Sequence, residues 1–144
     1  MRSLARLTLC LLAAALFAPA LLNAQRGPVR GSLIEDRAAR KLLEAGDARL
    51  DADEKEKALE IWQSVLERYP RSKVRYAAHM RIGNHLLTEK GSYDQARKHF
   101  EAAASEENAD DAMRAEATLN QGTCFFEAQL YGKCFSIMRR VIED

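Results

Sequence analysis

The sequence predicts an all-α fold in which about three helical hairpins follow one another as a short solenoid. The first observation is a 38-residue repeat in the apolar pattern, seen in ALEIWQSVLERYP, ARKHFEAAASEEN and CFSIMRRVIED. Corresponding positions are Ala58, Ala96 and Cys134, and likewise Trp62, Phe100 and Met138. The second observation is that no stretch after residue 24 resembles a strand bounded by turns. Helical hairpins repeat in this way because one hairpin cannot bury its apolar side alone.

The N-terminal segment, residues 1–24, is predicted to be a secretory signal peptide. It carries Arg2 and Arg6 and then an uncharged, largely apolar run that ends in small residues. We expect cleavage after Ala24, with cleavage after Ala20 as the alternative. An uncleaved anchor helix is disfavoured because the run is short for a membrane span and contains a proline.

Composition and charge narrow the class of protein. The chain is 47% hydrophobic and 30% charged, which is typical of a folded domain. Without residues 1–24, two of the 22 basic residues are lost, so 20 basic residues face 21 acidic ones. A net charge near −1 gives no electrostatic reason to expect nucleic acid or an anionic membrane as the partner.

A flexible linker over residues 25–32 leads into the first hairpin, predicted over residues 33–70. Ser32 and Glu35 match a capping box at the start of its first helix. Asp53 is expected to cap the second helix. The six predicted helices span about residues 33–50, 54–69, 73–90, 93–105, 111–128 and 132–144.

The second and third hairpins are predicted over residues 72–107 and 109–144. Ser72 is expected to cap the third helix, and Gly91 to end it. The stretch Ser92–Gln95 matches a second capping box.

Small residues indicate how the two helices of a hairpin meet. Antiparallel helices approach closely where both contribute small side chains. We therefore expect Gly83 to face Ala96, and Gly122 to face Cys134.

The pattern of small and aromatic positions resembles the tetratricopeptide repeat family over about residues 36–144. The matching residues are Gly46, Ala58, Trp62, Val65 and Pro70 in the first hairpin; Gly83, Leu86, Tyr93, Ala96, Phe100 and Ala103 in the second; and Gly122, Phe125, Tyr131, Cys134, Met138 and Val141 in the third. Lys55 stands where the family has an aromatic residue in the turn. The junction Tyr69–Ser72 (YPRS) resembles the stretched repeats of bacterial envelope proteins.

The resemblance implies a groove along the first helices of the hairpins that binds a protein or peptide partner. Its predicted lining is Leu43, Asp47, Leu50, Met80, Asn84, Leu87, Leu119, Asn120, Thr123 and Phe126. Such an apolar strip with polar inserts suits an extended peptide or a partner helix. The alternative, equally weighted, is a surface against which a further repeat stacks.

The sequence carries no recognisable motif for catalysis, cofactor binding or metal binding. His79 and His85 are six residues apart and so lie on different sides of one helix, while His99 belongs to another helix. The carboxylates are scattered, and no nucleophile or phosphate-loop motif occurs. We therefore expect no enzyme activity, no cofactor, no metal and no small-molecule substrate.

Cys124 and Cys134 allow two interpretations. An oxidising compartment would permit a disulfide between these two residues of paired helices. The alternative, which we favour, is that each thiol fills a small apolar position of the repeat.

The sequence thus predicts an exported, periplasmic interaction scaffold of the bacterial envelope. It stops inside the last predicted helix without a C-cap glycine, and we expect a longer array. The alternative function is that of a helical N-terminal part of an envelope enzyme, such as a lytic transglycosylase. Membrane association is expected only if the signal segment is uncleaved.

Overall fold

The structure is a computed structural model that describes residues 32–89 and 91–143. The predicted signal peptide and all of the predicted linker except Ser32 lie outside these residues. The helices are α2 (Leu33–Asp51), α3 (Lys55–Arg68), α4 (Val74–Thr88), α5 (Tyr93–Ala103), α6 (Asp111–Glu127) and α7 (Tyr131–Glu143). No residue in the described part of the chain forms a strand, and the predicted all-α fold is confirmed.

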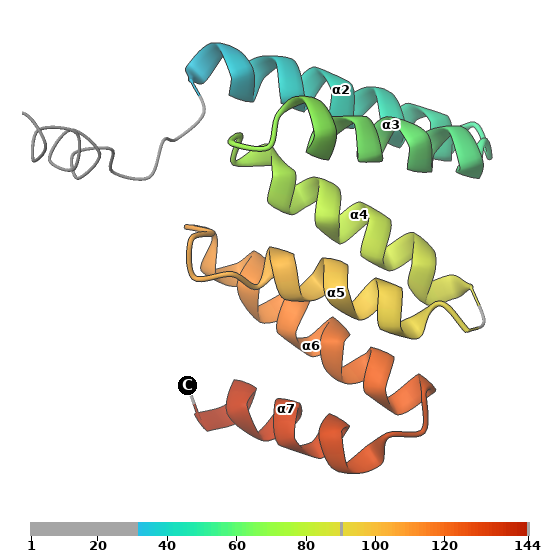
Figure 1. Cartoon of the computed structure of the whole chain (residues 1–144), viewed down its shortest axis with the longest axis vertical. Coiled ribbons are helices and arrows are strands. Elements are labelled where there is room, and N and C mark those ends of the chain that lie inside the picture. The colour runs from blue at the N-terminus through green and yellow to red at the C-terminus, as the bar shows by residue number, and fades with distance from the viewer. Residues whose placement is uncertain (1–31, 90, 144) are drawn as a thin grey trace, which may run out of the picture.

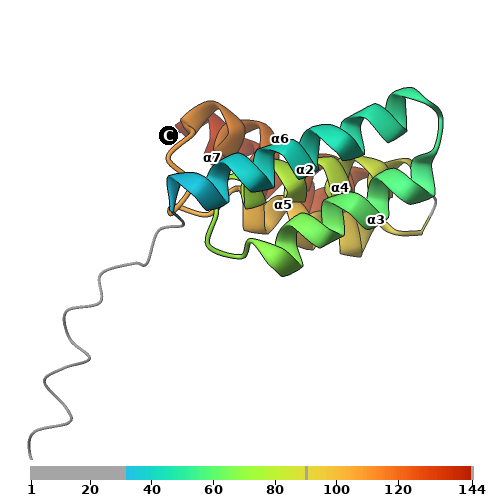
Figure 2. The same cartoon turned by 90° about the horizontal axis from the view of Figure 1, so that it is seen from above.

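The helices form three antiparallel hairpins, α2 with α3, α4 with α5, and α6 with α7, which follow one another along the molecule (Figure 1). The view from above shows the first hairpin lying over the following ones, so that the hairpins form a stack (Figure 2). Each helix packs on the next, and α2 also contacts α4 directly. This arrangement is the predicted solenoid.

Each hairpin turns at one residue in the left-handed backbone region. These residues are Asp53 (φ 59°), Gly91 (φ 93°) and Gln129 (φ 60°), each 38 residues after the previous one. A left-handed residue commonly closes the C-terminus of a helix and redirects the chain. The 38-residue repeat of the sequence is therefore also a repeat of backbone conformation.

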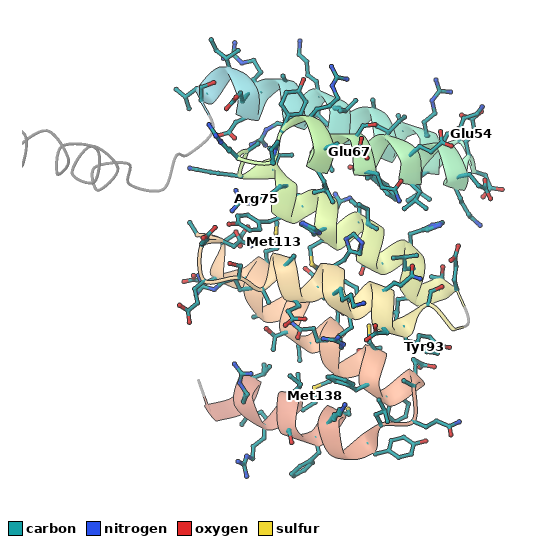
Figure 3. All side chains as sticks on the ribbon, viewed as in Figure 1. Glu54, Glu67, Arg75, Tyr93, Met113 and Met138 are labelled. Carbon is teal, nitrogen blue, oxygen red and sulfur yellow. The ribbon has the colours of Figure 1, made fainter. Side chains whose placement is uncertain are left out.

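Within each hairpin, a glycine of the first helix lies against a large side chain of the second helix. A Cβ atom placed on Gly83 would lie 2.7 Å from the ring of Phe100, and one on Gly46 would lie 2.5 Å from the indole of Trp62. In the third hairpin, a Cβ atom on Gly122 would meet Met138, which lies on the side of α7 that faces α6 (Figure 3). The repeated positions of Trp62, Phe100 and Met138 thus share one structural role.

The predicted small-to-small pairing was wrong about the partner of the glycine. The nearest atoms to Gly83 belong to Phe100 and not to Ala96, and those nearest to Gly122 belong to α7 residues other than Cys134. Ala96 is fully buried, but the space opened by the missing side chain of glycine is filled by the residue one turn further along. A large side chain in that space buries more apolar surface than a second small residue would.

The predicted helix caps at Asp53 and Ser92 were also wrong. Asp53 does not cap α3, because it adopts the left-handed turn conformation; Glu54 is the N-cap residue and makes no side-chain cap. Ser92 does not cap α5, because its ψ of 11° is far from the extended conformation that directs a capping hydroxyl to the helix. The capping box of Ser32 and Glu35 is confirmed, with both hydrogen bonds present.

Ser72 is not the N-cap residue of α4 as predicted, because Lys73 takes that position and makes no side-chain cap, but Ser72 still bonds to the start of the helix. Its hydroxyl accepts a hydrogen bond from the Val74 amide at 3.1 Å and donates one to Asp36 Oδ1 at 2.7 Å. The same oxygen of Asp36 accepts a hydrogen bond from the Lys73 amide at 3.1 Å. Asp36 belongs to α2, so the first hairpin supplies a carboxylate to the N-terminus of α4, where negative charge is favoured.

The core consists of two clusters. The first joins α2, α3 and α4 around Trp62, Val65 and Ile82, and the second joins α4, α5 and α6 around Phe100. Because α4 contributes to both clusters, it connects the first hairpin to the rest of the stack.

Candidate partner-binding groove

The predicted groove residues come from α2, α4 and α6, the first helices of the three hairpins. A side-chain hydrogen bond joins α4 to α6, from Asn120 Nδ2 to Asn84 Oδ1 at 3.3 Å. Residues of α2 and α4 are joined by an ion pair between Asp47 and Arg81. The three first helices therefore present one surface, which we call the groove face.

A polar row crosses the groove face. The Asp47 carboxylate accepts hydrogen bonds from Arg81 Nε at 3.0 Å and Nη2 at 3.3 Å, and from Trp62 Nε1 at 3.1 Å. Arg81 lies three residues before Asn84 and so on the same side of α4. The row runs from Asp47 through Arg81 and Asn84 to Asn120.

Arg81 was missed by the sequence analysis. The signal that could have found it is its spacing from Asn84, because residues three apart in a helix share a side. Its long side chain reaches the Asp47 carboxylate on the neighbouring hairpin. The sequence analysis had instead assigned the preceding residue, Met80, to the groove.

Exposed apolar side chains flank this row. Leu50 lies at the end of α2, and Leu119 and Phe126 lie on α6, with Phe126 56% exposed. The Phe126 ring also contacts the Tyr131 ring edge-on, with centroids 5.6 Å apart. The apolar surface of the groove face is thus concentrated on α6 and at the end of α2.

Three predicted groove residues are placed elsewhere. Leu43 and Met80 are buried, at 7% and 3% exposure, and support the groove face from beneath. Leu87 is half-buried and packs against the second core cluster. These residues lie between the side of the helix that faces the groove and the side that faces the core. The apolar periodicity of a helix does not show which of these two sides such a residue faces.

Thr123 makes its hydrogen bond within its own helix. The Thr123 hydroxyl donates to the Leu119 carbonyl at 3.3 Å, a common arrangement for threonine in a helix. Of the remaining predicted residues, Asp47, Asn84 and Asn120 belong to the polar row, and Leu50, Leu119 and Phe126 are exposed apolar residues of α2 and α6.

Two further surfaces lie outside the groove face. A hollow beside α6 and α7 is lined by Phe125, Gly132, Lys133, Ser136 and Ile137 and contains no predicted groove residue. The outward side of α7 carries Phe135, 70% exposed, and Ile142, 84% exposed, which we call the end face. These residues follow Leu59 and Leu66 by 76 positions, and both of those leucines pack against the first core cluster.

The cysteine thiols are free in this structure. Cys124 is buried in the second core cluster, and Cys134 is half-buried. Burial raises the pKa of the Cys124 thiol to about 11, so this thiol is protonated and unreactive at neutral pH. The arrangement corresponds to the packing interpretation and not to the disulfide.

Among the described residues, no helix combines the length and the apolar character needed to cross a membrane. In the same part of the chain, no cluster of three or more histidine, cysteine, aspartate or glutamate side chains is arranged to hold a metal ion.

Comparison with models of protein families gives a match in the first hairpin. A model described as the tetratricopeptide repeat matches residues 42–72, which run from the middle of α2 through α3 to Ser72. This match identifies residues 42–72 as a tetratricopeptide repeat, and the two following hairpins share the same helical-hairpin architecture. The match lies in the hairpin where Lys55 replaces the aromatic turn residue, so that departure does not obscure the repeat. The sequence matches none of the curated proteins with which it was compared.

Proposed function

We propose that this tetratricopeptide repeat protein is a non-catalytic scaffold of the bacterial envelope that binds a peptide or partner helix on its groove face. Tetratricopeptide repeats generally mediate protein–protein interaction through the surface formed by successive hairpins. The observation that carries the proposal is the polar row of Asp47, Arg81, Asn84 and Asn120 with exposed apolar residues beside it.

This combination suits an extended peptide better than a flat protein surface. Each asparagine amide has donors and acceptors that can bond to the main chain of a peptide, whatever its side chains. Leu119 and Phe126 supply the apolar area, and Arg81 supplies a cation that a peptide carboxylate could share with Asp47. We expect partners with apolar side chains and at least one acidic group.

The test uses a peptide selected on the wild-type protein from a displayed library of random peptides. Its affinity is measured for wild type and for the groove variant Leu50→Asp with Leu119→Asp. Neither leucine belongs to a core cluster, so the variant should keep its helicity. We expect affinity to fall by about tenfold or more, since about 1.4 kcal/mol corresponds to a factor of ten.

The matched control is Phe135→Asp with Ile142→Asp, which places the same two charges on the end face. The groove proposal predicts unchanged affinity in this control. If the end-face variant loses the peptide and the groove variant retains it, the end face is the binding surface and the proposal is wrong.

Export to the periplasm is the second part of the proposal, supported by the charged and then apolar pattern of residues 1–24. The protein is produced from its full sequence in a bacterial host, and the periplasmic fraction is analysed by N-terminal sequencing. We expect a chain that begins at Gln25. Protein confined to the cytoplasm with residues 1–24 intact would contradict export.

A further inference from the structure

Two histidines meet inside the second hairpin. His79 on α4 and His99 on α5 bring their Nδ1 atoms to 3.0 Å, with ring centroids 5.1 Å apart and ring planes tilted by 48°. Both side chains are half-buried. The two residues are 20 positions apart in the sequence, so they do not form a recognisable metal-binding motif.

Burial favours the neutral form of both rings, which is the form that can bind a metal ion. Burial lowers the pKa of His79 to about 4, helped by His99 and Arg75, and burial also lowers the pKa of His99. A neutral imidazole carries one hydrogen, so in the metal-free pair one Nδ1 donates its hydrogen to the other. Metal binding needs both Nδ1 atoms free of hydrogen, and a shift of that hydrogen to Nε2 provides this without net proton release.

The spacing of the nitrogens favours a particular metal geometry. With metal–nitrogen bonds of about 2.0–2.1 Å, a 3.0 Å separation corresponds to an angle of roughly 91–97° at the metal. That angle suits adjacent positions of a square-planar or tetragonal ion and is smaller than the tetrahedral angle of zinc sites. Tetragonal nitrogen sites are typical of Cu²⁺ and Ni²⁺, and the Irving–Williams order places Cu²⁺ first.

We propose that His79 and His99 chelate a Cu²⁺ ion through their Nδ1 atoms and so join α4 to α5. Water would complete the coordination, because the described residues offer no third histidine, cysteine or carboxylate in the cluster. Arg75, whose charge acts on His79, is paired with Glu107 at 2.8 Å, which offsets its repulsion of the metal. An ion that binds the folded hairpin and not the unfolded chain stabilises the fold.

The test titrates Cu²⁺ itself into the purified protein and follows affinity and melting temperature. His79→Gln and His99→Gln each remove one ligand, and His85→Gln is the matched control because His85 lies on α4 outside the pair and contacts Glu89. We expect wild type and His85→Gln to bind Cu²⁺ with equal affinity and a raised melting temperature. Each ligand variant should bind at least about tenfold more weakly, because chelation through two groups is lost. Equal affinity in all four proteins would overturn the proposal.

A second measurement needs no variant and so does not depend on their folding. In NMR spectra of the histidine rings of the wild-type protein, a small amount of paramagnetic Cu²⁺ should broaden the signals of His79 and His99 and spare those of His85. Broadening of His85 alone, or equal broadening of all three rings, would overturn the proposal.

Discussion

At the scale of single residues, each hairpin is closed by one glycine and one large side chain. Trp62, Phe100 and Met138 fill the space beside Gly46, Gly83 and Gly122. The correspondence of the three large residues was predictable from the repeat, because equal spacing places them at equal positions. Their contact with the glycine was not predictable, because spacing along one helix does not say which of two residues one turn apart reaches the other helix.

The glycine contact predicts opposite effects for two alanine substitutions. In Gly83→Ala the new methyl group would lie 2.7 Å from the Phe100 ring. This overpacking lowers the free energy of unfolding by about 1–3 kcal/mol. The higher helix propensity of alanine raises it by about 1 kcal/mol. We expect a net loss in the free energy of unfolding of about 1 kcal/mol, measured by urea denaturation. Gly132→Ala, where nothing lies within 4 Å of the added carbon, should be neutral or slightly stabilising. Equal effects at the two positions would contradict the packing described here.

The histidine pair predicts a pH dependence of stability. The folded pKa of His79 is about 4, below its usual 6.5, so the unfolded chain binds more protons between these values. The contribution of His79 to stability is complete above about pH 6.5 and is lost as the pH falls toward about 4. Denaturation in metal-free buffer across this range should give a shallower pH dependence for His79→Gln than for wild type, whereas parallel curves would contradict the lowered pKa.

At the scale of the elements, the turns and caps decide where each helix begins and ends. The sequence predicted six helices close to their observed bounds, because Pro70, Gly91 and the capping box at Ser32 are local signals. The failed caps at Asp53 and Ser92 have one cause. Both residues belong to a left-handed turn. Asp53 is itself the left-handed residue, and Ser92 directly follows the left-handed Gly91, so neither has the extended conformation of a capping residue.

The link between Asp36 and Ser72 depends on tertiary structure, since the two residues are 36 positions apart. We expect Asp36→Ala and Ser72→Ala each to lower the free energy of unfolding by about 1–2 kcal/mol, because each removes a side-chain hydrogen bond to a backbone amide at the start of α4. The double variant should lose less than the sum of the two, with a coupling of about 0.5–3 kcal/mol in a double-mutant cycle. Strict additivity would mean that the hydrogen bond does not join the hairpins in solution.

At the scale of the whole molecule, stacking creates surfaces that no single hairpin carries. The predicted groove residues come from first helices that meet across the stack, because α2 contacts α4 and Asn120 of α6 donates a hydrogen bond to Asn84 of α4. The ion pair of Asp47 with Arg81 and the meeting of His79 with His99 were not predictable, because each joins residues of different helices whose rotation is set by packing. Periodicity identifies the apolar side of a helix. The packing of neighbouring hairpins determines which part of that side is buried.

The measurement that tests the groove proposal most directly is an NMR titration of the protein with the peptide selected on it. The account predicts that the side-chain amide signals of Asn84 and Asn120 shift, together with backbone signals near Leu119, while signals of α7 around Phe135 stay in place. Shifts confined to α7, with the two asparagine amides unchanged, would contradict binding on the groove face.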